Sequence, residues 1–65
     1  MKIRYFANTD KLRIEFRAAK VAETRDLDES TLLDVDTQGK ICAVTVEHAS
    51  EHAGIAEFSY EQVVA

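Results

Sequence analysis

The stretch from Thr31 to Ser50 constrains the fold more than any other part of the sequence, because it indicates two strands joined by a tight turn. Four polar residues, Asp36-Thr37-Gln38-Gly39, separate two apolar runs. A glycine at the end of such a loop adopts a left-handed conformation without steric cost, and an aspartate at its start accepts a hydrogen bond from the backbone two residues on. The sequence therefore predicts a β-hairpin with Gly39 at positive φ.

The apolar pattern on either side of the turn suggests the register of this hairpin. A four-residue loop pairs Val35 with Lys40, Leu33 with Cys42 and Thr31 with Val44. A shift of one residue would turn every side chain to the other face, so burial is expected to select this pairing. We call the side of the sheet with Leu33, Cys42 and Val44 the first face. The opposite, second face carries Leu32, Asp34, Ile41, Ala43 and Thr45.

Three further segments alternate between apolar and polar residues as strands do. They are Met1–Phe6, Lys11–Phe16 and, with weaker apolar anchors, Val21–Leu27. Five short strands at this spacing predict a mainly β fold, an antiparallel meander that forms a single domain over residues 1–65. The residues expected to be most buried are Ile3, Tyr5, Leu12, Ile14, Phe16, Leu33, Val35, Val44 and Val46.

The segment after Glu51 allows two interpretations. Ser59 and Gln62 fit the capping box of a short C-terminal helix, with Phe58 and Val63 at the positions of a hydrophobic staple. The alternative is a sixth strand from Ile55 to Glu61, with Phe58 and Tyr60 on one face. We favour the helix.

Composition and charge exclude several classes of protein. The net charge of −4 disfavours nucleic-acid binding, which needs clustered lysine and arginine. No apolar run has the ~18 residues of a membrane span, and the N-terminal residues lack the apolar core of a signal peptide. One cysteine excludes an internal disulfide. We therefore expect a cytoplasmic protein that binds neither nucleic acid nor a membrane.

Two clusters in the sequence resemble metal sites. Asp34, Asp36 and Gly39 match the start of a calcium loop, but its twelfth position, which needs an acidic residue, is Thr45. These three residues are therefore assigned to the turn. His48 and His52 are four residues apart, as zinc ligands on a helix are, with Glu47 or Glu51 as a third ligand. The segment lies where a strand should end, however, so we expect a solvated strand exit and no bound metal or other cofactor.

Cys42 is the one candidate nucleophile, with His48 as its base. The predicted register places Cys42 on the first face between apolar neighbours, where a thiol behaves as a small hydrophobe. No glycine-flanked serine and no glycine-rich phosphate loop occurs in the sequence. We therefore predict no catalytic residue.

Several segments resemble a known family. They are Tyr5, the segment from Asp10 to Ile14, Val21 to Arg25, Asp34 to Ile41, Val44 to Val46, and Ala49-Ser50. Together they resemble the small prokaryotic proteins grouped as domain-of-unknown-function family 2283, over Lys2 to Ser50. The family usually has glycine where this chain has Ala43, and an acidic residue where it has His48. The resemblance implies a compact, mostly β domain and no activity.

The leading hypothesis for function is a non-catalytic interaction module of the prokaryotic cytoplasm, antitoxin-like or an accessory partner in a small operon. The alternative is a metal-binding protein or small hydrolytic enzyme that uses Glu47, His48, Glu51 and His52. A domain this small is marginal alone, so we also predict a homodimer, with a small partner protein as a further option. The predicted interface residues are Leu32, Ile41, Ala43 and Phe58.

Overall fold

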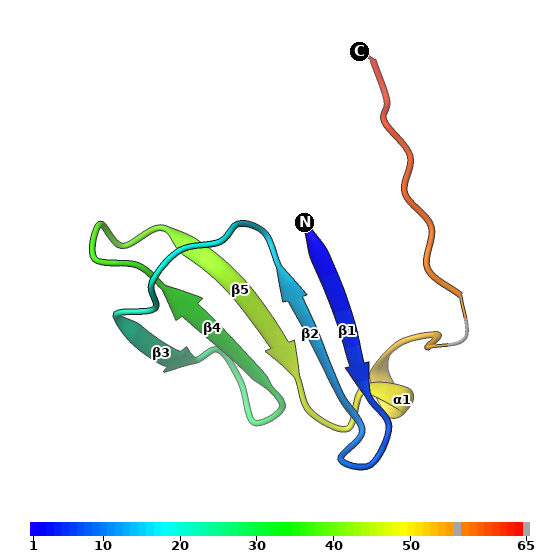
Figure 1. The fold of residues 1–65 in the computed structure, drawn as a ribbon. Coiled ribbons are helices and arrows are strands. Elements are labelled where there is room, and N and C mark those ends of the chain that lie inside the picture. The colour runs from blue at the N-terminus through cyan, green and yellow to red at the C-terminus, as the bar shows by residue number, and fades with distance from the viewer. Residues whose placement is uncertain (56, 65) are drawn as a thin grey trace.

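The computed structural model describes residues 1–55 and 57–64, in which five antiparallel strands form one sheet (Figure 1). The strands are β1 (Lys2–Phe6), β2 (Lys11–Glu15), β3 (Glu23–Asp26), β4 (Thr31–Val35) and β5 (Ile41–Val46). One short helix, α1 (Ala49–His52), follows β5. The predicted mainly β fold class is confirmed.

The spatial order of the strands is β1-β2-β5-β4-β3, which departs from a simple meander. The connection after β2 crosses to the far edge of the sheet, and β5 then returns between β2 and β4 (Figure 1). This order places β5 beside the apolar residues of β2, with Leu12 opposite Val46 and Ile14 opposite Val44. The least apolar strand, β3, is fully exposed and forms an edge, as expected where burial decides strand position.

The predicted register of the β4–β5 hairpin is wrong by two residues. Leu33 pairs with Val44 and Thr31 with Val46, and a β-bulge lies where Val35 pairs with Ile41. The β-bulge and a loop longer than the predicted four residues together account for this two-residue shift. Because side chains alternate with a period of two, this shift leaves Leu33 and Val44 on the predicted first face. The bulge does interrupt the alternation at Ile41, which lies opposite Val35 of the first face.

The predicted turn chemistry is confirmed. Gly39 has a φ of 79°, and its N–H donates to the Asp36 carbonyl at 3.0 Å. Asp36 Oδ1 accepts hydrogen bonds from the N–H groups of Gln38 at 2.8 Å and Lys40 at 2.9 Å. One carboxylate oxygen therefore holds the loop closed.

Replacement of Gly39 by valine is expected to lower the free energy of unfolding by about 1–2 kcal/mol or more, because a β-branched residue is strained at positive φ. Gly54→Val is the matched control. A Cβ atom at either glycine meets no atom within 4 Å, so the two sites differ in backbone conformation and not in space. Equal melting temperatures for the two variants would contradict this account of the turn.

The helix lies elsewhere than predicted. It occupies Ala49–His52, where a solvated strand exit was expected, and residues 57–64 contain neither helix nor strand. The predicted C-terminal helix from Ser59 is therefore wrong. Short helices depend on packing of an apolar face, and nothing packs against this segment. The alternative sixth strand, Ile55–Glu61, is not formed in its described part and includes residue 56, which lies outside the described residues.

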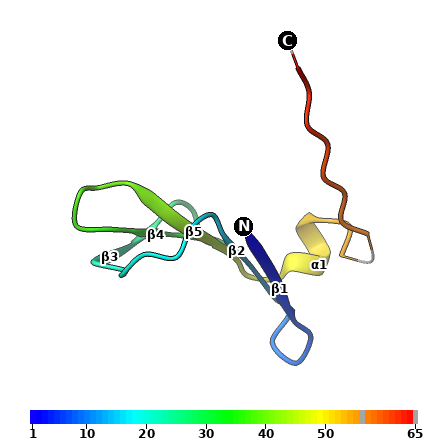
Figure 2. The same ribbon diagram turned by 45° about the horizontal axis from the view of Figure 1, so that its top comes forward.

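Burial within the sheet differs from the expected core. Leu12, Val35 and Cys42 are buried as predicted, whereas Ile3 is 44% exposed and Phe16 is 43% exposed. The other predicted core residues, Tyr5, Ile14, Leu33, Val44 and Val46, are half-buried. The prediction was wrong for Ile3 and Phe16 because it assumed a covering layer. Figures 1 and 2 show a single sheet with no second layer stacked on it.

Among the described residues, no helix has the length and apolar character needed to cross a membrane.

Candidate functional site

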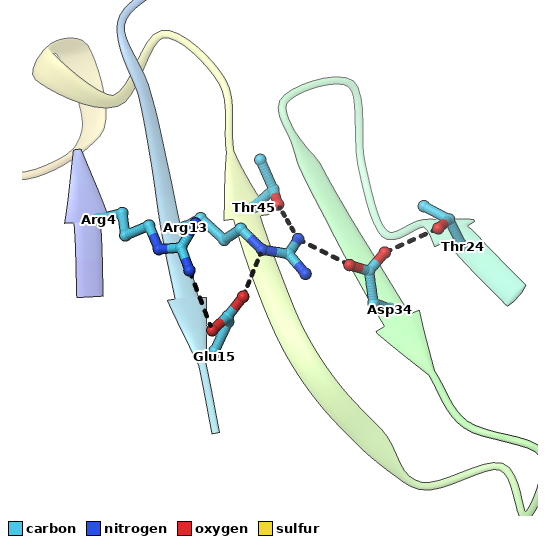
Figure 3. A network of polar contacts seen from close by, with 6 residues as sticks. All are labelled: Arg4, Arg13, Glu15, Thr24, Asp34 and Thr45. Atoms are coloured by element: carbon cyan, nitrogen blue, oxygen red, sulfur yellow. Dashed lines mark hydrogen bonds and ion pairs between the residues drawn. The ribbon is translucent and has the colours of Figure 1, made fainter. Parts of the chain in front are cut away.

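A polar network crosses the second face and includes residues of all five strands (Figure 3). Arg13 on β2 and Asp34 on β4 are its centre, with 2.7 Å between Arg13 Nη1 and Asp34 Oδ2. The two strands are not neighbours, because β5 lies between them. β5 presents the small Ala43 and Thr45 at this point, and these leave room for the longer side chains to meet across it.

Further contacts extend the network to both edges of the sheet. The Thr24 hydroxyl donates to Asp34 Oδ1 at 2.7 Å, and Arg13 Nη1 donates to the Thr45 hydroxyl at 3.3 Å. Glu15 accepts from Arg13 Nε at 3.3 Å and lies 3.9 Å from Arg4 Nη2. Both oxygens of the Asp34 carboxylate therefore have partners. In the described part of the chain, no buried side-chain nitrogen or oxygen lacks one.

The network holds its central groups in their charged forms. Burial acts to raise the pKa of Asp34, but the hydrogen bonds from Thr24 and Arg13 outweigh it and leave that pKa below its usual value. The Asp34 carboxylate in turn raises the pKa of Arg13. A general acid or base needs a pKa near the working pH, and these shifts move both groups away from neutrality. The geometry is that of a structural ion pair.

A second polar cluster fastens α1 to the turn between β1 and β2. Asp10 adopts a φ of 55°, and its carbonyl accepts the Ala49 N–H at 2.9 Å. Its carboxylate accepts the Tyr5 hydroxyl at 2.6 Å, the Ser50 hydroxyl at 2.7 Å and the Ser50 N–H at 3.1 Å. The Tyr5 hydrogen bond is the largest cause of the lowered pKa of Asp10, and the same bond raises the pKa of Tyr5. Ala49 is fully buried at this junction.

The histidines lie next to this junction. His48 directly precedes α1 at a φ of 52°, and its Nδ1 is 3.9 Å from Glu51 Oε2, with both side chains about 70% exposed. His52 lines a different feature, a surface pocket of about 350 Å³ formed with Asp28 to Thr31 and Val46. Within the described residues, no group of three or more His, Cys, Asp and Glu side chains could hold a metal ion. The structure therefore does not bring Glu47, His48, Glu51 and His52 together as one ligand set.

Asp36 of the predicted turn also holds a second segment. It forms an ion pair with Arg17, which follows β2. The hydrogen bond from the Lys40 N–H is the largest cause of the lowered pKa of Asp36, and the Gln38 N–H and Arg17 add to it. Asp36 and Gly39 form the turn, whereas Asp34, which was assigned to the turn as well, lies within β4 and pairs with Arg13. Arg17 and Asp36 are 19 residues apart in the sequence, so this pairing could not be seen in the local pattern.

The stability of the fold is expected to fall in acid, because four aspartates have lowered pKa values. These are Asp10, Asp28, Asp34 and Asp36. A carboxylate whose folded pKa lies below its unfolded value of about 4 contributes stability above that pH and loses it as the pH falls toward the folded pKa. We expect the melting temperature to fall below about pH 4. Asp36→Asn should weaken this dependence, and a melting temperature that stays constant or rises in acid would contradict it.

The first face has no comparable closing layer of side chains. Ile3 and Phe16 are each more than 40% exposed. Phe16 directly follows β2, and its N–H donates to the Cys42 carbonyl. On the second face, Ala43 is 1% exposed and Asp34 is 8% exposed, although that face carries the charges. The first face therefore combines the buried Leu12, Val35 and Cys42 with the exposed Ile3 and Phe16, whereas the polar network lies on the second face.

The predicted interface residues lie in different environments. Ala43 presents almost no surface, Leu32 is half-buried, Ile41 is 46% exposed beside the bulge, and Phe58 is 50% exposed in the tail. Their participation in an interface stays a prediction.

These features define a small antiparallel β domain whose polar clusters stabilise its turns, its helix and its second face. The chain belongs to the family described as "Protein of unknown function (DUF2283)", whose model matches residues 2–50. The match confirms the resemblance seen in the sequence and covers the same range, residues 2–50. Residues Tyr5, Asp10 and Ser50, which carry part of that resemblance, are the ones that meet at the α1 junction. No curated protein and no solved structure gives a significant match.

Proposed function

We propose that the protein is a non-catalytic interaction module that binds a small partner protein through the first face of its sheet. One observation carries this proposal: Ile3 and Phe16, two large apolar side chains of the first face, are each more than 40% exposed. Ile3 on β1 and Phe16, directly after β2, lie near each other at one end of this surface, and the half-buried Ile14, Leu33 and Val44 lie on the same face. Exposed apolar patches of this kind are typical of protein-binding surfaces.

The partner would pack against a sheet face, as one layer of a β-sandwich or a helix does. Its contact surface should be mainly apolar, because most of the first face offers aliphatic and aromatic side chains. The exposed Arg25–Glu23 ion pair lies on the same face at the β3 edge. We place this role in the prokaryotic cytoplasm, as an antitoxin-like or accessory protein of a small operon. The polar clusters support this role indirectly. The contacts of each cluster within the fold account for its residues, so no catalytic role is needed to explain them.

The test is capture of the partner from the native host by the tagged chain, with two matched variants. Phe16 is 43% exposed on the first face, and Phe6 is 41% exposed at the end of β1, where alternation places it on the second face. Phe16→Glu and Phe6→Glu make the same chemical change at equal exposure. We expect the same partner to bind the wild-type chain and the Phe6→Glu variant, and to be lost with Phe16→Glu.

Loss with Phe6→Glu alone, or with neither variant, would contradict the proposal. Circular dichroism and a thermal melt of each variant show whether loss reflects binding and not unfolding.

A further inference from the structure

The C-terminal tail, residues 57–64, carries large apolar side chains that are at least half exposed. Phe58 is 50% exposed, Tyr60 82%, Val63 74% and Val64 89%. Figures 1 and 2 both show the tail leaving α1 beyond the β1 edge and running away from the sheet. The tail lies outside residues 2–50, which match the family model.

The nearest unpaired element is the outer edge of β1. β1 pairs with β2 on one side only, so alternate backbone N–H and C=O groups along Lys2–Phe6 have no sheet partner on the other. Its first-face residues are Ile3 and Tyr5, and its second-face residues include Lys2 and Arg4. An extended segment that joins this edge would satisfy the free backbone groups.

The sequence of the tail complements this edge on both faces at once. Phe58 and Tyr60 alternate with Glu57, Ser59 and Glu61. If the aromatic pair lies on the first face beside Ile3 and Tyr5, the same alternation places the two glutamates on the second face. There they meet Lys2 and Arg4, which are both exposed. Opposite charges and apolar pairs across neighbouring strands each stabilise a sheet.

The exposed area indicates that a second copy supplies the missing contact. The chain exposes 5134 Å², whereas a folded monomer of 7.3 kDa is expected to expose about 4,200 Å². The excess of roughly 900 Å² is close to the ~800 Å² that one partner contributes to a standard protein interface. The tail is directed away from its own β1, as it must be to reach another molecule (Figure 1).

We propose that the protein is a homodimer in which residues 57–64 of each copy pair with the β1 edge of the other as a sixth strand. Exchange of an identical element is a common route to a two-fold dimer. This assembly covers the first face only beside Ile3 and Tyr5, so the partner protein that we propose would bind the rest of that face, around Phe16 and Leu33.

Sedimentation equilibrium of the full chain at micromolar concentration tests the oligomeric state. We expect a dimer for the wild-type chain and a dissociation constant raised at least about tenfold by Tyr60→Pro, because proline removes a donor from the strand. Tyr60 is 82% exposed in the single copy, so folding of the sheet should be unaffected. A monomeric wild-type chain, or a Tyr60→Pro dimer of unchanged affinity, would overturn the proposal.

Cysteine cross-linking identifies the strand that the tail joins. In a Cys42→Ala background, oxidation of the Ile3→Cys/Tyr60→Cys double variant should give a covalent dimer of twice the monomer mass. Ser59→Cys replaces Tyr60→Cys in the matched control, because its side chain should face the other side of the sheet, and it should cross-link less. A link within one chain would show that the tail folds onto its own β1. That result, or equal linking in the control, would contradict the exchange.

Discussion

Replacement of Leu12 by alanine is expected to lower the free energy of unfolding by about 2–5 kcal/mol. Leu12 is 5% exposed on the inner strand β2, opposite Val46 of β5 and Tyr5 of β1. Loss of its side chain leaves a cavity at the junction of three strands, in a domain that has few other buried residues. Because small domains have total stabilities of about 5 kcal/mol, we expect this variant to be largely unfolded near physiological temperature.

Leu27→Ala is the matched control, because Leu27 is 62% exposed after β3. The two variants remove the same atoms, so the difference between their urea midpoints measures burial alone. An equal effect of the two substitutions would show that the sheet does not pack around Leu12 as described.

Replacement of Arg13 by methionine is expected to lower the free energy of unfolding by about 1–3 kcal/mol, because it leaves the buried Asp34 carboxylate with one fewer partner. The double variant Arg13→Met/Asp34→Leu removes both charges. It should be more stable than the sum of the single effects predicts, with a coupling energy of about 0.5–3 kcal/mol. Chemical denaturation of the wild-type chain, the two single variants and the double variant gives this coupling.

Arg25→Met provides the comparison for an exposed pair. The Arg25–Glu23 ion pair has the same 2-residue spacing as Arg13–Glu15, but both side chains are more than half exposed. Its loss should leave the urea midpoint unchanged, since solvent screens such pairs. A zero coupling energy between Arg13 and Asp34 would show that the network on the second face contributes as little as this surface pair.

The sequence predicted the parts of the fold that depend on local chemistry. The Asp36–Gly39 turn is formed by hydrogen bonds between residues at most four positions apart, so its residue types were sufficient to identify it. The alternation along β1, β2, β4 and β5 likewise identified the strands and their faces. The register failed because a bulge between β4 and β5 has no local signal in this segment.

The features that the sequence did not reveal depend on contacts between distant residues. α1 is fixed by the bonds of Asp10 to Ala49 and Ser50, forty residues away in the case of Ser50. The Arg13–Asp34 pair crosses β5, whose Ala43 and Thr45 are small at this point, whereas a meander would have placed β3 between β2 and β4. Asp34 within the apolar run from Leu32 to Val35 was the one available signal for it. A charge in such a run requires a partner.

The exposure of apolar side chains on the first face follows from the single-layer architecture of the sheet. A sheet in which the chain forms only one layer has two sides to protect, and here the polar network protects one of them. The apolar side then depends on another molecule or remains exposed.

Fluorescence of the dye 8-anilinonaphthalene-1-sulfonate, which binds exposed apolar surface, tests the open face most directly. The native wild-type chain should increase the dye fluorescence while it still unfolds cooperatively on heating. Phe16→Glu should remove most of this increase, and Phe6→Glu should leave it unchanged. If the wild-type chain binds no dye, or if the two variants lower the fluorescence equally, the first face is not the open apolar surface on which this account depends.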